Sequence, residues 1–374
     1  MTQPESAKSA LMLPGGGARG AYQVGVLQAI MEFMPEGFRF PVISGTSAGA
    51  INAAVLASHA KDQDHGVDRL NHFWTHIHCE DVYRTDARQV FKTMSKVFGS
   101  VLFGRLGVKP PRSLLDNRPL AELLSRELHL EQIQTAIDDG ELTGLSISAT
   151  SYDTSMAKCF YQANDAVIPW HRSRRVGMPQ DITVEHIMAS TALPFLFPAQ
   201  LIDHEYYGDG GLRNMAPLSP AIHLGGDRIL VVGTRDESPI DVPQETGSYP
   251  SMGELGGYML DTIFMDTLMA DLSRVERINE TLDLVDQSSS KKSHLKKIKT
   301  LVINPSIDVR EITQAHAHCI PKPVKTLLKV IGGWGKDWRM PSYLLFEPSY
   351  TGALIELGHQ DAMNQMDEIR SFLS

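Results

Sequence analysis

The chain has few cysteines and no excess of positive charge. Its 374 residues include three cysteines, Cys79, Cys159 and Cys319. An odd and scattered set of this kind argues against a disulfide framework and favours a reducing compartment. The 44 acidic and 35 basic residues give a formal net charge of −9. There is therefore no global electrostatic case for nucleic acid as a partner.

The chain also lacks a long uninterrupted apolar run. Residues 1–9 are polar and carry no basic segment followed by an apolar core, so we expect no signal peptide. Residues 40–60 are free of Lys, Arg, Asp and Glu, but they contain Pro41, Asn52 and His59, which a transmembrane helix would disfavour. We see no internal repeat. The sequence predicts a cytoplasmic protein that is at most peripheral at a membrane.

A glycine-rich loop follows the first apolar segment. Residues 10–13 read as a strand, Gly15-Gly16-Gly17-Ala18-Arg19-Gly20 as a loop, and residues 21–34 as a helix. The loop fits a dinucleotide-binding pattern, which would need an acidic residue near the end of the second strand for the ribose. Residues 38–60 offer no acid there. Glycine amides can equally point at an oxyanion, and we favour that interpretation.

The second strand leads into a serine between two glycines. Gly45-Thr46-Ser47-Ala48-Gly49 separates the apolar residues 38–43 from the helical residues 50–56. This pattern is typical of a nucleophile elbow, although it also occurs in purely structural turns. At a helix N-terminus, Ser47 would lie where unpaired N–H groups favour a developing negative charge.

Further along the chain, an aspartate stands between glycines at the end of a strand. Residues 200–207 have strand character and lead into Gly208-Asp209-Gly210-Gly211. A carboxylate at this position is a candidate catalytic group, with an Asx-type turn as the alternative. Other strands are predicted at residues 142–150, 156–162 and 228–232, and a long amphipathic helix at residues 258–284.

Two other segments carry candidate functions. His72 and His76 have the spacing of two metal ligands on one helix face, but no recognised carboxylate spacing accompanies them, so we assign no metal site and no cofactor. Residues 87–103 combine an apolar stripe with basic residues on another face. This pattern fits either a helix packed on the core or a peripheral contact with a membrane.

Taken together, the glycine loop, the serine elbow and the aspartate motif resemble the patatin-like phospholipases. The match consists of residues 15–20, 45–49 and 209–211 in the family's order, and residues 190–198 and 214–217 resemble the blocks around the aspartate. The resemblance implies an α/β/α fold of three layers with a central, mostly parallel sheet, followed by a largely helical C-terminal region. It also implies a lipid acyl hydrolase acting on phospholipids or other acyl esters.

The resemblance assigns roles to six residues. Ser47 is the nucleophile and Asp209 its base, in a dyad without histidine. Gly15, Gly16, Gly17 and Arg19 belong to the oxyanion loop, with Arg19 acting electrostatically at the oxyanion or at an anionic head group. For Asp209 to act as a base, its carboxylate should be desolvated and its pKa raised.

Two other functions remain possible from the sequence. A general carboxylesterase or α/β-hydrolase would use a Ser-Asp-His triad, and His223, His294, His316, His318 and His359 all follow Asp209. A non-catalytic lipid-binding or scaffold protein could keep the fold without the chemistry. The sequence does not indicate the oligomeric state.

The expected domain organisation has three parts. Residues 1–9 form a polar tail, residues 10–307 a catalytic domain with its core motifs between 13 and 217, and residues 308–374 a helical region that packs on or caps that domain. The polar, lysine-rich residues 288–299 read as a surface loop.

Overall fold

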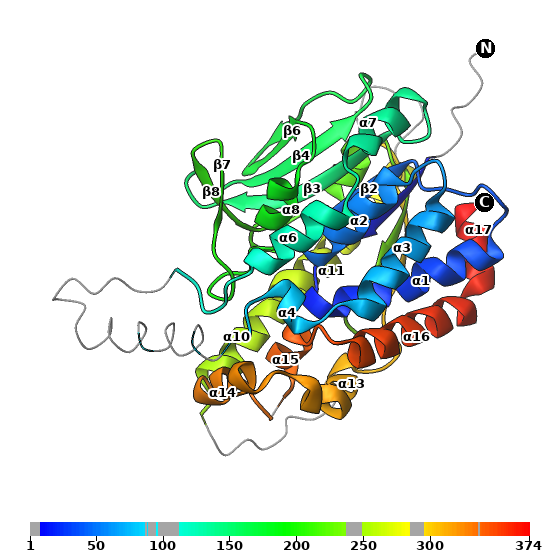
Figure 1. The fold of residues 1–374 in the computed structure, drawn as a ribbon. Helices are drawn as coiled ribbons and strands as arrows, with labels where there is room; N and C mark the ends of the chain where they lie inside the picture. Colours follow the sequence, from blue (N-terminus) through cyan, green and yellow to red (C-terminus); the bar gives the residue numbers. More distant parts are fainter. Residues whose placement is uncertain are drawn as a thin grey trace, which may run out of the picture.

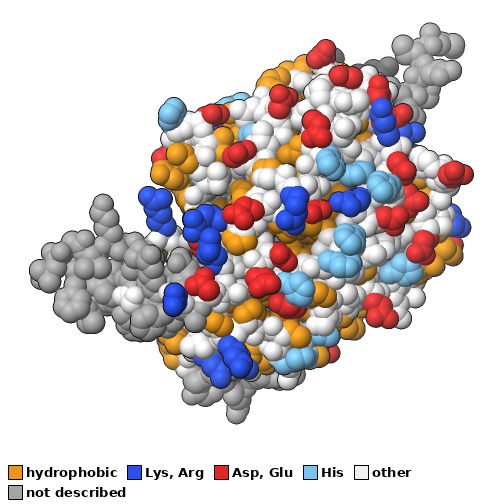
Figure 2. Space-filling view, viewed as in Figure 1, with side chains coloured by type: hydrophobic (Ala, Val, Ile, Leu, Met, Phe, Trp, Pro, Cys, Tyr) orange, Lys and Arg blue, Asp and Glu red, His pale blue; other side chains and the backbone are white. Residues whose placement is uncertain are grey.

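The computed structural model describes residues 8–86, 88, 95, 112–236, 249–284, 295–335 and 337–374. Residues 1–7 of the predicted tail lie outside this range, as does most of the 87–103 segment, so membrane contact through that segment stays a prediction. Among the described residues, no helix combines the length and apolar character needed to cross a bilayer. On the face drawn in Figure 2, acidic and basic side chains are interspersed.

The described strands form one ten-stranded sheet (Figure 1). They are β1 (Ser9–Leu13), β2 (Val42–Thr46), β3 (Gly144–Ser151), β4 (Ala157–Ala163), β5 (His171–Arg172), β6 (Arg175–Pro179), β7 (Gln200–Ile202), β8 (Glu205–Asp209), β9 (Arg228–Val232) and β10 (Lys299–Ile303). The order is β10-β9-β1-β2-β3-β4-β6-β5, with β8 paired to β3 and β7. The first five strands in this order are parallel, whereas β3 pairs with β4 and β8 in the antiparallel sense.

Both faces of the sheet are covered, and the central strands β1, β2 and β3 are buried along their whole length. Alternate residues of a strand point to opposite faces, so Leu11 and Leu13 join the core under α1 (Ala21–Phe33), α2 (Ala48–Ser58) and α3 (Gln63–His76). Ala10 and Met12 join the other core, under α9 (Ser219–His223) and α11 (Thr267–Leu284). The predicted three-layer α/β/α fold is confirmed.

The remaining described helices surround these layers. They are η1 (Gly17–Gly20), α4 (Cys79–Val82), α6 (Arg118–Glu127), α7 (Glu131–Asp138), α8 (Val184–Ser190), η3 (Gly210–Leu212), α10 (Met252–Asp261), η4 (Thr262–Asp266), α13 (Val309–His316), η5 (Ala317–Cys319), α14 (Lys322–Val330), α15 (Arg339–Leu344), α16 (Pro348–Asn364) and α17 (Met366–Leu373).

The C-terminal helices pack directly against the first helix of the chain. A Cβ atom on Gly25 of α1 would overlap the carbonyl of Ile355, and one on Gly358 of α16 would overlap the carbonyl of Tyr22. The two backbones therefore touch where glycines face each other. Because these helices share the core with α1, the division predicted between residues 307 and 308 stays a prediction.

Two boundaries differ from the sequence prediction. The first strand begins at Ser9, inside the predicted tail, because Ser9 pairs with Arg228 of β9. The long helix predicted for residues 258–284 begins at Met252, after a capping box formed by Ser251 and Glu254, and a π-helical segment, η4, interrupts it. The adjacent glycines 256 and 257 weaken the helical signal at this start.

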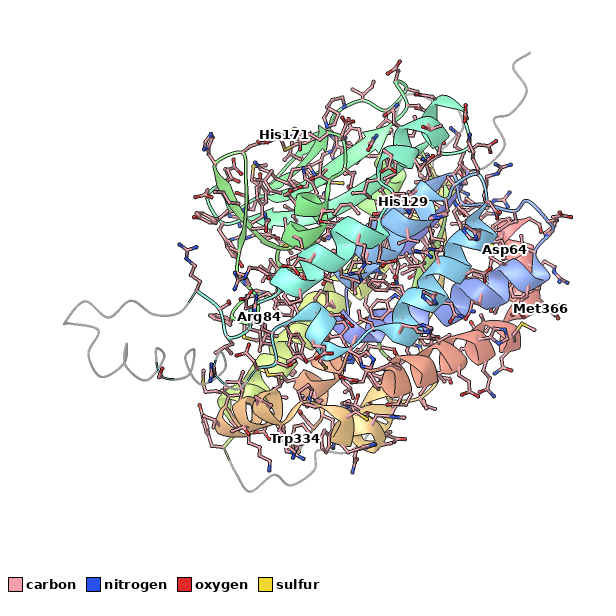
Figure 3. All side chains as sticks on the ribbon, viewed as in Figure 1. Asp64, Arg84, His129, His171, Trp334 and Met366 are labelled. Atoms are coloured by element: carbon pink, nitrogen blue, oxygen red, sulfur yellow. The ribbon has the colours of Figure 1, made fainter. Side chains whose placement is uncertain are left out.

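Four aromatic residues of the C-terminal region form two groups, Trp334 with Trp338 and Tyr343 with Phe346. Trp334 lies beside the C-terminal helices at the bottom of Figure 3, where it packs edge-on against Trp338 at 5.2 Å between ring centroids. Tyr343 and Phe346 instead line a cavity beside Ser47. Trp334 contacts the main core as a partly buried side chain, whereas Tyr343 and Phe346 are buried within it.

Candidate active site

Ser47 lies on a sharp turn between β2 and α2. Its backbone has φ 55° and ψ −127°, a conformation that non-glycine residues rarely adopt. The turn is tight, because a Cβ atom on Gly49 would overlap the carbonyl of Leu13 and one on Gly45 would overlap the carbonyl of Gly49. Ser47 is therefore a strained residue that its close neighbours hold in place.

Strand register brings Asp209 next to this elbow. On β3, Ser148 pairs with Thr46 of β2 and the following residue, Ala149, pairs with Asp209 of β8. Strand β8 therefore pairs with β3 beyond the point where β2 ends. Residues 162 positions apart in the chain become neighbours across one strand.

The Asp209 carboxylate is completely buried. One oxygen, Oδ1, accepts a hydrogen bond of 2.8 Å from the Gly211 amide. The other, Oδ2, has no hydrogen-bond partner within the described part of the chain. Burial raises the pKa of Asp209 to about 7, against the opposing effects of the Ser47 hydroxyl and the Gly211 amide.

The Ser47 hydroxyl is therefore close enough to act on Asp209 electrostatically, but the two do not form a hydrogen bond of normal geometry here. Contacts of this kind commonly tighten only when substrate binds. The arrangement has a serine hydroxyl beside a buried carboxylate whose pKa is near neutral. A carboxylate with this pKa can take a proton from a neighbouring hydroxyl and return it.

Ser190, at the end of α8, braces the elbow. Its hydroxyl accepts a 2.8 Å hydrogen bond from the Ser47 amide and donates a 2.6 Å hydrogen bond to the Ser148 carbonyl. The Ser47 amide is thus engaged and is not free for a substrate oxygen. Ser190 belongs to one of the blocks that resemble the family, but this role is not visible in the sequence, because the contact joins residues 143 positions apart.

The glycine loop lies against Ser47. A Cβ atom on Gly15 would come within 2.8 Å of the Ser47 Cβ atom. Gly17 has φ 55° and packs on the Tyr343 carbonyl, where any side chain would clash. Within the described residues, the amides of Gly15 and Gly16 donate to no backbone carbonyl. The loop therefore places two amides without a backbone acceptor close to Ser47.

The Arg19 side chain is held by residues from the second half of the chain. Its guanidinium is buried and donates to Ser342 at 2.9 and 2.7 Å and to Asp261 at 3.1 Å. It also lies 4.0 Å from the centre of the Tyr343 ring. The side chain thus contacts α10 and α15, and in this state it is not exposed to a head group. The structure leaves its predicted electrostatic role at the oxyanion as a prediction.

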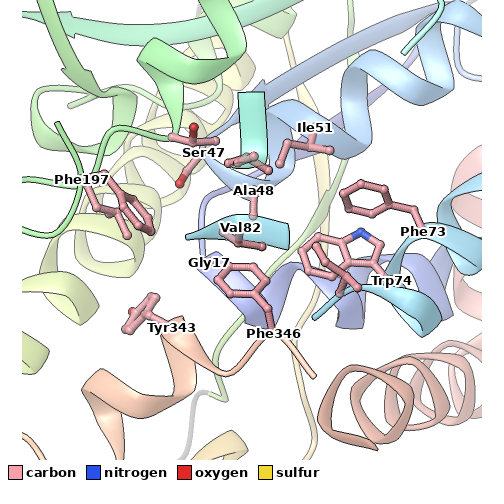
Figure 4. Close-up of a pocket in the computed structure, with 14 residues that line it drawn as sticks. Gly17, Ser47, Ala48, Ile51, Phe73, Trp74, Val82, Phe197, Tyr343 and Phe346 are labelled. Carbon is pink, nitrogen blue, oxygen red and sulfur yellow. The ribbon is translucent and has the colours of Figure 1, made fainter. Parts of the chain in front are cut away.

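A narrow apolar cavity extends from Ser47 (Figure 4). Ser47 and Phe197 lie at one side of this group, and Phe73 and Trp74 lie at the opposite side. The cavity volume is about 20 Å³, room for about one water molecule. An acyl chain could enter this space only if the lining side chains moved apart.

The histidines considered in the sequence analysis lie elsewhere. His223 stacks on Trp170 at 4.5 Å, His359 pairs with Glu32 at 3.0 Å, and His318 faces the Ala315 carbonyl. His316 lies near Tyr350, and His294 is outside the described residues. In the part of the chain that the structure describes, no hydrogen bond joins a histidine to Ser47 or Asp209.

The centres of the His72 and His76 rings on α3 lie 4.1 Å apart, with the ring planes tilted by 34°. Across the residues that can be described, no group of three His, Cys, Asp or Glu side chains has the geometry to hold a metal ion. These two histidines accordingly have no third ligand to complete a site there.

Comparison with known proteins gives one match to a family and several to structures. A family model described as patatin-like phospholipase matches residues 11–222. No curated protein matches the chain.

Among solved structures, VipD from Legionella pneumophila is 14% identical with a TM-score of 0.37, over 98% of this chain and 67% of VipD. Human GIVD cytosolic phospholipase A2, in complex with methyl gamma-linolenyl fluorophosphonate, is 13% identical with a TM-score of 0.44, over 98% of this chain. The match spans only 58% of that phospholipase chain.

Proposed function

Because the chain belongs to the patatin-like phospholipase family, we propose that it is a serine lipid acyl hydrolase that cleaves carboxylic ester bonds of phospholipids. The observation that carries the proposal is the pairing of Ser47, on a strained elbow, with Asp209, a fully buried carboxylate whose pKa is raised to about 7. A base of this pKa is well matched to catalysis near neutral pH.

The first half of the reaction makes an acyl-enzyme. Asp209 takes the proton of the Ser47 hydroxyl as Oγ attacks the carbonyl carbon of the ester. The negative charge that forms on the carbonyl oxygen meets the amides of the Gly15–Gly17 loop. When the tetrahedral intermediate collapses, the ester C–O bond breaks and Asp209 returns the proton to the departing alkoxide.

The second half releases the fatty acid. Asp209 takes a proton from water, whose oxygen attacks the acyl carbon. The C–Oγ bond then breaks, and the proton passes from Asp209 to the Ser47 oxygen. No second side chain is required, which is why a dyad suffices. Ser190 supports both halves, because it holds the Ser47 backbone against β3.

Mass spectrometry of products tests the proposal. The wild-type protein is mixed with phospholipids, lysophospholipids and triacylglycerols in equal amounts, with Ser47→Ala as the control. We expect the wild type alone to release fatty acid from phospholipid or lysophospholipid. Cleavage of a soluble short-chain ester without release from either phospholipid class would instead support a general carboxylesterase.

We expect Trp74 to limit the length of the acyl chain. Its buried indole lines the cavity, donates to Asn52 at 2.8 Å and stacks on Phe346 at 6.2 Å. Replacing it with phenylalanine would lengthen the apolar space. Since burying one methylene is worth about 0.8 kcal/mol, or about fourfold in affinity, Trp74→Phe should raise the ratio of kcat/KM for dodecanoyl over butanoyl esters several-fold.

A series of p-nitrophenyl esters from butanoyl to dodecanoyl measures this ratio, because each added methylene tests whether the cavity can bury it. Trp170→Phe is the matched control, because Trp170 is also buried but stacks on Tyr161 at the other core. An unchanged chain-length ratio in Trp74→Phe, or an equal change in both variants, would contradict the assignment.

A further inference from the structure

One buried carboxylate, Asp261, is surrounded by several arginine side chains. Asp261 is the last residue of α10 and is only 4% exposed. Its Oδ1 lies 3.1 Å from the Arg19 guanidinium and accepts a 2.8 Å hydrogen bond from the Tyr343 hydroxyl. Its Oδ2 lies 3.0 Å from Nε of Arg339 and 3.9 Å from Arg235. One carboxylate thus joins the glycine loop, the segment after β9 and α15.

The charges around Asp261 keep it ionised. Although burial alone would raise its pKa, Arg19, Arg235 and Arg339 together with the Tyr343 hydroxyl hold the pKa below the ordinary value. Asp261 and Asp209 are both buried, yet their pKa values move in opposite directions. Asp261 is consequently a fixed negative charge, which suits it to hold a cation in place.

Arg19 connects Asp261 to the glycine loop. Its backbone amide donates to the Gly16 carbonyl at 3.1 Å, which closes the loop. Its side chain reaches the other way, to Asp261 and to the Ser342 hydroxyl. One residue therefore ties the shape of the loop to α10 and α15. Gly17 packs against the carbonyl of Tyr343, which belongs to α15. The loop is therefore supported both through the Arg19 side chain and through its own backbone.

The helical segment that follows Asp261 also contacts the loop beside Asp209. In the π-helical segment η4, just beyond Asp261, the Phe264 ring packs where a Cβ atom on Gly15 would lie. The same ring would be 2.9 Å from a Cβ atom on Gly211, whose amide binds Asp209. Residues 261–264 therefore contact both loops that flank Ser47. π-Helical turns inside α-helices are frequent at functional sites.

We propose that Asp261 is a positioning residue for acyl transfer: by holding Arg19, it keeps the amides of the Gly15–Gly17 loop aimed at the developing oxyanion. This inference rests on the proposed function. Asp261 does not touch the substrate and takes no proton. Its effect falls on the transition state, where the oxyanion forms, so its loss should lower kcat more than it changes KM.

The test compares three variants. Asp261→Asn removes the charge, and Ser342→Ala removes a second hydrogen-bond partner of Arg19 without changing any charge. Asp271→Asn is the matched control, because Asp271 is a buried carboxylate on the same helical segment that pairs with Arg274 at 2.8 Å and with the Leu218 amide. Steady-state kinetics with p-nitrophenyl butyrate gives kcat and KM, and hydrogen exchange reports on the loop amides directly.

We expect Asp261→Asn to lower kcat at least about tenfold with KM within about threefold, since one misaligned oxyanion donor costs about a hundredfold or more. Ser342→Ala should lower kcat by a smaller factor. Both variants should speed hydrogen exchange of the loop amides, whereas Asp271→Asn should leave loop exchange and kcat near wild type even where its Tm falls.

Two results would overturn the inference. In one, kcat falls by the same factor in Asp261→Asn and Asp271→Asn, and the loss of kcat parallels the fall in Tm. In the other, loop exchange is unchanged in both Asp261→Asn and Ser342→Ala. If Asp261→Asn does not fold, Ser342→Ala decides. If the wild type cleaves no ester, the proposed function fails on its own, and hydrogen exchange still shows whether Asp261 holds the loop.

Discussion

Replacement of Ser47 by alanine is expected to lower kcat at least about a hundredfold while the protein stays folded. The variant loses the oxygen that bonds to the acyl carbon. The other hydroxyls that line the cavity, those of Thr191 and Tyr343, donate to the Met188 carbonyl and to Asp261 instead. The oxyanion donors and the apolar cavity remain, so a small residual rate is compatible with the mechanism. Hydrolysis of p-nitrophenyl butyrate measures the loss.

The backbone at Ser47 supplies a second readout. Its φ of 55° is strained for any residue with a Cβ atom, and such strain costs about 1–3 kcal/mol. Ser47→Gly should therefore be inactive but more stable than Ser47→Ala in thermal melts. A Ser47→Ala variant that keeps most of its activity would exclude Ser47 as the nucleophile. A glycine variant less stable than the alanine variant would contradict the strain argument.

The parts of the site that are contiguous in the chain were predictable. The glycine loop and the elbow each depend on residues within about one turn, and turn chemistry of this kind is visible in sequence. The strand, loop and helix around residues 9–33 follow from apolar periodicity. The family resemblance supplied the order of the three motifs, and the match to residues 11–222 confirms the family.

The links between distant segments were not predictable from periodicity or spacing. The neighbourhood of Ser47 and Asp209 depends on the register of β3, and the brace by Ser190 depends on where α8 ends. The pairing of Arg19 with Asp261 spans 242 positions. Asp261 also lies just before the region of the long helix where the hydrogen-bond pattern changes, and an apolar stripe does not distinguish α from π turns.

These long-range contacts explain why the C-terminal region matters to the site. The family model ends at residue 222, yet Asp261, Ser342 and Tyr343 hold Arg19 of the glycine loop. A loop rich in glycine has little conformational preference of its own, so neighbouring elements must define its shape. The residues that shape it can therefore lie well outside the motifs that identify the family.

Replacement of Asp209 by asparagine should separate activity from stability. We expect kcat to fall at least about a hundredfold, because asparagine cannot accept the Ser47 proton. In the wild type, kcat/KM should rise with pH up to about 7, since only the ionised carboxylate acts as a base. A wild-type profile that is flat between about pH 5 and 8 would contradict this role for Asp209.

The same substitution should raise the free energy of unfolding, by an amount that depends on pH. Between the ordinary pKa of 3.8 and the folded-state pKa of about 7, folded Asp209 holds a proton that the unfolded chain releases. Raising the pH through this range therefore destabilises the wild type, by about 1.4 kcal/mol per unit of difference and about 4 kcal/mol in total above pH 7. Because an asparagine side chain does not ionise, Asp209→Asn should match the wild type near pH 4 and exceed its stability at pH 8.

Urea denaturation of both proteins at about pH 4 and pH 8 measures this difference in the free energy of unfolding. Asp308→Asn is a control of opposite sign, because Arg310 holds the pKa of Asp308 below its ordinary value despite burial, which tends to raise it. Its replacement should therefore destabilise the protein at pH 8. If Asp209→Asn were less stable than the wild type at pH 8, the buried carboxylate would be a structural group satisfied by its contacts. A gain confined to high pH, together with lost turnover, is what a desolvated catalytic base requires, because the burial that raises its basicity also destabilises its ionised form.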